Sequence, residues 1–172
     1  MKNRANHLSN MINCIIAVIC FAGCTGKKEI LVYTIPAEPT PPDSWGFASP
    51  VGPEKARFTI TDTNGTASVT MTVLQGDGGG LLGNVNRWRG QLGLEKLEEK
   101  KLADALMPVK GLGKKASMID ITGISQRSQI ETRLVGVIVS DNGLTWFYKL
   151  MGSTSVVEEA KEGFLEYLPR WR

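Results

Sequence analysis

Histidine and cysteine are nearly absent from this 172-residue sequence, which holds one histidine and three cysteines. All four lie near the start of the chain, as His7, Cys14, Cys20 and Cys24. The rest of the chain therefore offers no Ser-His-Asp triad, no Cys-His pair, no imidazole metal ligand and no disulfide. We expect no catalytic residues, no metal site and no cofactor.

A strong charge of either sign is lacking as well. The formal net charge is +3, and Lys2 and Arg4 in the first segment contribute to it without any acid beside them. A near-neutral remainder provides no electrostatic case for nucleic-acid binding, so we expect no nucleic-acid partner.

The apolar run from Met11 to Phe21 is too short to be a permanent membrane span, which needs about 20 apolar residues. A short apolar run behind two basic residues is typical of an export signal, here residues 1–23. The next residues, 24–28, are predicted to be a short tether, and residues 29–172 a single domain large enough to bury a core.

The stretch Phe21-Ala22-Gly23-Cys24 resembles the bacterial lipobox, with Phe21 in place of the usual Leu. The resemblance implies that Cys24 is acylated and becomes the new N-terminus. Acyl chains contribute about 0.8 kcal/mol per buried CH2, so several chains anchor a protein stably. Thr25 is not the Asp that resembles an inner-membrane retention signal. We therefore expect a lipid-anchored protein of the cell envelope, in the outer membrane on its periplasmic side or at the cell surface. The alternative is an ordinary secretory peptide that leaves Cys24 a thiol.

Six of the eight prolines lie in residues 36–53, so this segment is predicted to be an extended loop without helix or central strand. We expect Trp45 to pin the loop to the domain. Just before it, the β-branched and apolar stretch Glu29–Ile35 is predicted to be the first strand.

Alternating apolar and polar residues predict antiparallel strands. The predicted hairpins pair 56–62 with 66–74 and 130–139 with 144–151, and a further strand is predicted at 116–121. Asn64-Gly65 and Asp141-Asn142-Gly143 lie between the paired strands, and each Asn-Gly is predicted to be a turn with both residues at positive φ.

Helices are predicted at 80–92, 96–106 and 155–168. Apolar residues at helical spacing place Trp88 of the first helix in the core, and Pro108 ends the second. Ser155 and Glu158 resemble a capping box at the start of the third helix, which Pro169 ends.

This order of elements predicts an α+β domain, an antiparallel β-sheet with helices packed on it. It resembles the PsbP-like α/β/α sandwich of photosystem extrinsic proteins over most of residues 29–168, without a diagnostic motif. The block Asn84-Val85-Asn86-Arg87-Trp88-Arg89-Gly90-Gln91-Leu92-Gly93 and the helix Phe164-Leu165-Glu166-Tyr167-Leu168 are similar to those of uncharacterised bacterial lipoproteins. That similarity implies a fold and an address, and no activity.

The glycine-rich run at 76–83 contains a formal G-x-G-x-x-G, formed by Gly78, Gly80 and Gly83, between a strand and a helix. The strand belongs to a hairpin and no βαβ unit follows, so the run predicts a flexible turn rather than a dinucleotide site. The alternative is that N–H groups of Gly78, Gly79 and Gly80 hold a small anion at the helix start.

Asn84, Arg87 and Gln91 share one helix face, with Asn86 and Arg89 alongside. This face is a candidate recognition surface for a carboxylate, a phosphate or a partner protein, because Arg suits bidentate contacts. The commoner alternative is structural, with the arginines paired to acids and the amides capping loops.

Most of the acids are expected to be solvated. The helix near 96–106 alternates Glu95, Glu98 and Glu99 with Lys96, Lys100 and Lys101, which is typical of a charged surface. Asp120, inside a strand, is the better candidate for a functional acid, with Lys149 or Arg133 as its partner. The tail Arg170-Trp171-Arg172 either lies on a membrane surface or is frayed.

These observations favour a non-catalytic, lipid-anchored domain that binds an envelope partner protein or a small anionic ligand. The alternative is a carboxylate-dependent envelope hydrolase, which requires two acids that converge in a cleft.

Overall fold

The computed structural model describes residues 40–112 and 115–171. The predicted signal, Cys24, the tether and the predicted strand Glu29–Ile35 lie outside the described residues. Within them, no helix combines the length and apolar character needed to cross a membrane.

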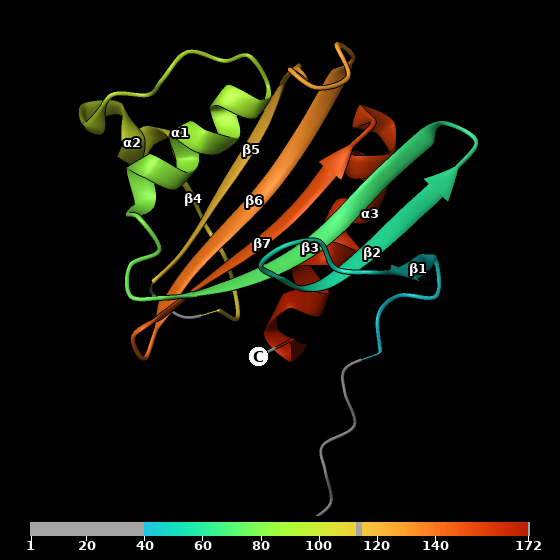
Figure 1. Cartoon of the computed structure of the whole chain (residues 1–172), viewed down its shortest axis with the longest axis horizontal. Coiled ribbons are helices and arrows are strands. Elements are labelled where there is room, and N and C mark those ends of the chain that lie inside the picture. Colours follow the sequence, from blue (N-terminus) through green and yellow to red (C-terminus); the bar gives the residue numbers. More distant parts are fainter. Residues whose placement is uncertain (1–39, 113–114, 172) are drawn as a thin grey trace, which may run out of the picture. The chain divides into compact units, whose positions relative to one another are not determined.

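Seven strands of the described residues form one antiparallel sheet, in the order β1-β2-β3-β7-β6-β5-β4 (Figure 1). The strands are β1 Trp45–Ala48, β2 Glu54–Asp62, β3 Gly65–Gln75, β4 Met107–Pro108, β5 Ala116–Ile124, β6 Glu131–Asp141 and β7 Leu144–Gly152. Because β7 pairs along its whole length with both β3 and β6, the last hairpin joins the two halves of the sheet. The predicted antiparallel sheet is confirmed.

The two hairpin turns differ. In the second, Asn142 (φ 48°) and Gly143 (φ 75°) both adopt positive φ, as predicted. In the first, Asp62 pairs with Gly65, so the turn residues are Thr63 and Asn64 and the prediction of an Asn64-Gly65 turn is wrong. The Asp62 carboxylate accepts a 2.6 Å hydrogen bond from the Asn64 N–H, a local contact that stabilises this turn.

The proline-rich segment is not wholly a loop. Residues Trp45–Ala48 pair with β2 at the edge of the sheet, which corrects the predicted loop at 36–53. This stretch contains no proline, and an edge position suits a strand that prolines flank. Trp45 is 5% exposed, so its predicted role as an anchor is confirmed.

Three helices pack on the sheet, and the α+β class is confirmed. They are α1 Leu81–Gln91, α2 Glu99–Ala105 and α3 Thr154–Tyr167, which the short 3-10 helix η1 Leu168–Arg170 extends. In Figure 1, α3 lies behind the sheet, α1 lies on the opposite side, and α2 lies beyond α1 at the left of the view. The second helix begins three residues later than predicted, and Pro108 lies in the two-residue edge strand β4, which was not predicted.

The start of α3 differs from the prediction. The helix begins at Thr154 with Ser153 at its N-cap position, and no side-chain cap is formed, so the predicted capping box of Ser155 and Glu158 is wrong. The physical reason is that the Glu158 carboxylate contacts Arg133 of β6 instead. The predicted end near Pro169 is confirmed to within a turn.

Each face of the sheet has its own core. The α3 face buries Phe58, Val69, Tyr148 and Leu150 against Phe164 and other residues of α3. On the opposite face, α1 packs Val85, Trp88 and Leu92 against Ile119, Leu134, Ile138 and Phe147. Trp88 is 6% exposed, which confirms its predicted place in the core. Its ring lies directly over Gly136 of β6, where any Cβ atom would collide with it.

Candidate functional site

The predicted polar face of α1 is largely used by the protein itself. Asn84 is 1% exposed, and its amide donates to the carbonyl oxygens of Gly78 (3.0 Å) and Gly80 (2.6 Å). The expectation that Asn84 lies on a solvent-facing surface is therefore wrong. Its side chain closes the turn that precedes the helix, as the structural alternative requires.

Two more residues of this face hold the connection to α2. The Asn86 amide donates to the Leu97 carbonyl (3.0 Å) and accepts from the Leu97 N–H (2.6 Å). Arg89 donates from Nε to the Glu95 carbonyl oxygen at 2.8 Å, and so contacts a main-chain group rather than an acid. These contacts dock the 94–98 segment on α1.

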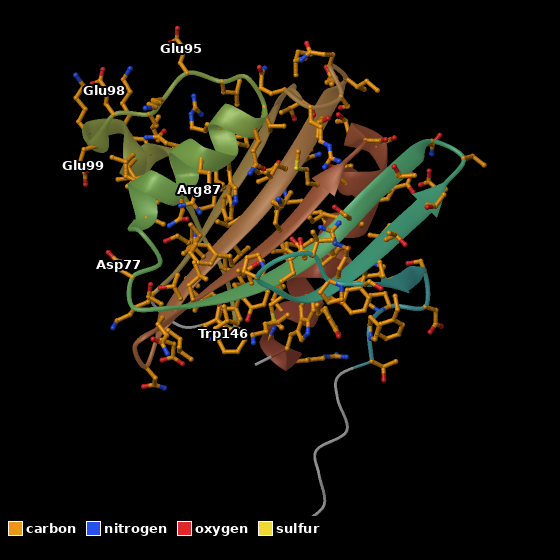
Figure 2. The ribbon with its side chains drawn as sticks, viewed as in Figure 1. Asp77, Arg87, Glu95, Glu98, Glu99 and Trp146 are labelled. Carbon is orange, nitrogen blue, oxygen red and sulfur yellow. The ribbon has the colours of Figure 1, made fainter. Side chains whose placement is uncertain are left out.

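Arg87 and Gln91 are the members of the set whose side chains make no hydrogen bond or ion pair with described residues. Arg87 is exposed on α1 (Figure 2). Gln91 is half-buried, and its main-chain carbonyl accepts from the Gln126 N–H at 2.9 Å. The polar face is thus reduced to two side chains, and its role in recognition stays a prediction.

The glycine turn also serves the fold. Gly78, Gly79 and Gly80 have φ values of 61°, 92° and 75°, a region that favours glycine. The Gly79 N–H donates to the Asp77 carboxylate (3.0 Å) and the Gly80 N–H to the Asp77 carbonyl (3.2 Å). Because these N–H groups are engaged and every paired strand is antiparallel, the geometry favours a structural turn over an anion or dinucleotide site.

The charged residues near α2 are solvated, as expected. Glu95, Glu98 and Glu99 are all exposed and extend away from the sheet (Figure 2). Lys100 pairs with Glu98 at 2.8 Å between two side chains that are mostly exposed, a contact worth little in water.

Asp120 is the centre of an ion network on the α3 face. Arg133 binds it through Nε to Oδ1 (2.8 Å) and through its terminal nitrogen to Oδ2 (2.8 Å), and Lys161 of α3 binds Oδ2 at 2.7 Å. Arg133 also contacts Glu158. The predicted partner Arg133 is confirmed, while Lys149 lies on the opposite face of the sheet, beside Phe147 and Met151 of the α1-side core.

The electrostatics of this network favour a structural role. Burial by itself raises the pKa of the Asp120 carboxyl, but hydrogen bonds from Arg133 and Lys161 outweigh that effect and hold the pKa below its usual value. A general acid needs a raised pKa, and both acids of the network are already paired with cations. The described residues also contain no group of three or more acids, cysteines or histidines arranged to hold a metal ion.

An aromatic pocket at the other end of α3 has the form of a ligand site. Its volume is about 660 Å³, and it lies between β1, β2 and η1. The rings that line it are Trp45, Phe47, Phe58, Tyr167 and Trp171. They contact one another, with ring centroids 5.4 Å apart for Trp45 and Tyr167 and 5.0 Å apart for Tyr167 and Trp171.

The rim of this aromatic pocket is cationic. Lys55 and Arg170 are exposed there, with Asp43 as the one acid among the lining residues. Phe47 is 80% exposed and presents an apolar ring at the mouth. The arrangement can bind a compound that combines an apolar body with an anionic group.

The C-terminal tail forms part of this wall. Trp171 is half-buried and packs on Phe58 (5.3 Å between centroids) and Tyr148 (5.9 Å). The expectation of a frayed tail is therefore wrong for Trp171, because its ring joins the core of the α3 face. The neighbouring residue of the predicted tail, Arg172, lies outside the described residues.

A second depression, of about 870 Å³, runs between α3 and the 108–111 segment. Its charged lining is mixed, with Lys110 and Lys161 facing Glu158, Glu162 and Glu166. Lys161 is already bound to Asp120, and this depression contains no aromatic ring. It is the weaker candidate for a small-molecule site.

No family model and no curated protein matches this sequence. Among solved structures, the chain is similar to the crystal structure of a protein from Bacteroides thetaiotaomicron VPI-5482, with 13% sequence identity and a TM-score of 0.42. The match covers 76% of this chain and 42% of that one, so the chain spans about two fifths of that protein's length.

Proposed function

We propose that this protein is a lipid-anchored binding domain of the cell envelope, and that the aromatic pocket is its ligand site. The ligand is a small compound with an apolar, ring-sized body and an anionic group. The observation that carries the proposal is the pocket of about 660 Å³, walled by five aromatic rings and rimmed by Lys55 and Arg170. Ligand sites typically enclose about 300–1,000 Å³ of mainly apolar surface with a few polar groups.

Preorganisation supports the proposal. Trp45, Phe58 and Tyr167 are buried and hold one another through ring contacts, so the pocket wall loses little side-chain freedom when a ligand enters. The two cations are exposed and paired with no acid among the described residues, which leaves them available to an anion.

Only the sequence supports the proposed location in the cell envelope. The lipobox-like Phe21-Ala22-Gly23-Cys24 supports acylation at Cys24, and the likeness of the Asn84–Gly93 block to uncharacterised lipoproteins points the same way. The element order, which resembles a PsbP-like sandwich, is compatible with a binding role and requires no catalytic group.

The pocket is tested with anilinonaphthalene sulfonate, a fluorescent probe that joins two aromatic ring systems to one sulfonate. We expect the Cys24→Ser chain to bind this probe saturably, and we expect the bound probe to quench the tryptophan fluorescence of the protein. Replacing Lys55 and Arg170 by Ala should weaken binding about 10-fold, since a charged hydrogen bond contributes about 1.5–3 kcal/mol. Binding of the uncharged parent, anilinonaphthalene, should not change.

The matched control is the double variant Arg87→Ala with Gln91→Ala, which removes the remaining polar side chains of α1. Both double variants change exposed or half-exposed groups and should move stability by no more than about 0.5 kcal/mol per site, which thermal melts check. Normal sulfonate binding after loss of Lys55 and Arg170 would contradict the pocket assignment. Loss of sulfonate binding in the Arg87→Ala, Gln91→Ala variant would show that the ligand binds at α1 instead of the aromatic pocket.

The anchor is tested separately. Cys24→Ser should release the protein from the membrane fraction or leave its first 23 residues attached. Normal processing together with unchanged membrane partitioning would contradict the lipoprotein assignment without affecting the pocket.

A further inference from the structure

One half of the α1 face of the sheet carries a row of polar side chains that α1 does not cover. Arg57 of β2 lies opposite Thr70 of β3, and Thr70 lies opposite Lys149 of β7. Directly opposed residues share one face of a sheet, so the three side chains form a continuous row. The sheet residues buried in the core that α1 covers come from β5, β6 and β7, and Leu74 of β3 packs against them. No residue of β2 belongs to this core among the described residues.

Two members of the row make no side-chain hydrogen bond or ion pair with the residues that the structure describes. Lys149 is half-buried and makes no hydrogen bond or ion pair with a described residue. The hydroxyl of Thr70, a residue 6% exposed, likewise makes none. Arg57 differs, because its Nε donates to the Glu54 carboxylate at 2.8 Å. An amine and a hydroxyl therefore stand side by side on adjacent strands, unused by the fold.

The surroundings of Lys149 disfavour its charged form. On one side it lies opposite Gly136, the residue that the Trp88 ring covers. Burial lowers the pKa of the Lys149 ammonium, attraction to Glu54 works against this shift, and repulsion from Arg57 adds to it.

The other charged groups of the neighbouring elements either bind a group other than Lys149 or lie away from it. Strand β3 carries none, Arg133 of β6 binds Asp120 on the opposite face, and Arg89 of α1 binds the Glu95 carbonyl. The guanidinium group of Arg87 lies beside Gly79, 3.7 Å from the position that a Cβ atom would take there. Glu54 and Arg57 are thus the charges that set the state of Lys149.

We propose that Lys149 is a nucleophilic amine that condenses with small aldehydes on the uncovered half of the sheet. Desolvation activates lysines of this kind, and here it comes from the burial of Lys149 beside Gly136, which the Trp88 ring covers. A carboxylate ligand is a poorer fit, because it would need the ammonium form that burial opposes.

The reaction balances without an oxidant or a reductant. The lone pair of Nζ attacks the aldehyde carbon and a C–N bond forms, while one proton of the amine passes to the carbonyl oxygen to give a neutral carbinolamine. The C–O bond then breaks, the hydroxyl leaves as water with the last proton of the nitrogen, and the nitrogen lone pair completes the C=N bond of a neutral imine. The Thr70 hydroxyl is placed to donate a hydrogen bond to the oxygen that is lost.

The test measures the reactivity of each lysine in the whole chain carrying Cys24→Ser. Acetaldehyde forms imines that cyanoborohydride reduces to stable ethyl-lysines, and peptide mass spectrometry gives a rate for every site. At pH 7 we expect Lys149 to react several-fold faster than the exposed Lys55 and Lys100, because a lowered pKa raises the fraction of the amine that is neutral. The advantage should shrink as the pH approaches 10. A Lys149 rate no greater than that of Lys55 and Lys100 at pH 7 would overturn the proposal.

Two variants separate activation from simple exposure. Arg57→Gln removes the repelling cation and frees Glu54, so the midpoint of the Lys149 pH–rate profile should move upward while that of Lys55 stays in place. Thr70→Val should slow Lys149 alone. An unchanged Lys149 profile in Arg57→Gln would overturn the proposal. The aromatic pocket lies on the other face of the sheet, so probe binding there is expected to continue in both variants.

Discussion

The two faces of the sheet are built differently. The α3 face has one apolar core that extends from Trp45 of β1 to Met118 of β5, and the charges at its edge, around Asp120, are paired. The α1 face has a smaller core over β5, β6 and β7, and beside it a polar row that holds the unpaired Lys149. Both faces bury an apolar core, and the second also holds Thr70 and Lys149, whose side chains form no hydrogen bond with the described residues. Native proteins usually concentrate such exceptions at functional positions.

The largest expected effect tests whether the smaller core matters as much as the larger one. Trp88→Ala should lower the free energy of unfolding by about 3–5 kcal/mol, as aromatic truncations in cores do. Denaturant titration measures it. Trp146→Ala is the matched control, because Trp146 is only half-buried and its loss should cost less (Figure 2 shows Trp146 near the start of β7). A midpoint near that of the parent would place Trp88 on the surface.

Removing the charge at the edge of the α3 face should have the next largest effect. Asp120→Asn leaves Lys161 without its counter-charge and Arg133 with the mostly exposed Glu158 alone, and should cost about 2–3 kcal/mol at pH 7. Because the folded pKa of Asp120 is lowered, this stability is present above the unfolded pKa, near 3.9, and is lost as the pH falls through the folded value.

Unfolding of the parent and of Asp120→Asn at pH 7 and pH 3 checks the sign of this dependence. The difference between them should shrink at the lower pH. Glu158→Gln is the control, because Glu158 is mostly exposed and should contribute little. A difference that grows on acidification would show that the network does not hold Asp120 ionised.

A substitution in the turn that precedes α1 should lower the free energy of unfolding by a smaller amount. Asn84→Ala removes two hydrogen bonds to the Gly78 and Gly80 carbonyls, and should lower the free energy of unfolding by about 1–2 kcal/mol in a thermal melt. Gln91→Ala, on the same helix, should change it by under about 0.5 kcal/mol. Equal effects of the two substitutions would contradict the separate structural role of Asn84.

The smallest expected effect is a gain in the free energy of unfolding, whereas the preceding substitutions lower it. Lys149→Met removes a half-buried amine whose charged form burial disfavours, so it should raise the free energy of unfolding by roughly 0.5–1 kcal/mol at pH 7. A lowered folded pKa means that the penalty is present at neutral pH and is relieved as the pH rises toward the unfolded pKa, near 10.4. The gain should therefore decline in melts run toward pH 10. A loss of stability would show that Lys149 supports the fold.

Local patterns were enough to predict the elements that repeat a period over several residues. The alternation around Asn142-Gly143 predicted the last hairpin, and the helical spacing around Trp88 predicted α1 and its buried face. Strands β1 and β4 were missed because four and two residues are too few to show a period. The first turn was misplaced because an Asp62 side-chain contact competes with the Asn-Gly signal.

By itself, the sequence determined the antiparallel α+β class, the core position of Trp88 and the absence of histidine and cysteine beyond Cys24, since these follow from local period and composition. Tertiary structure alone decided where the candidate sites lie. Trp45 and Trp171 come from opposite ends of the described chain and line the same pocket because both pack on Phe58 and Tyr167. Lys149 meets Thr70 because β7 pairs with β3, a strand it does not follow in sequence. No local pattern encodes such a pairing, because it depends on the summed burial of residues distant in the chain.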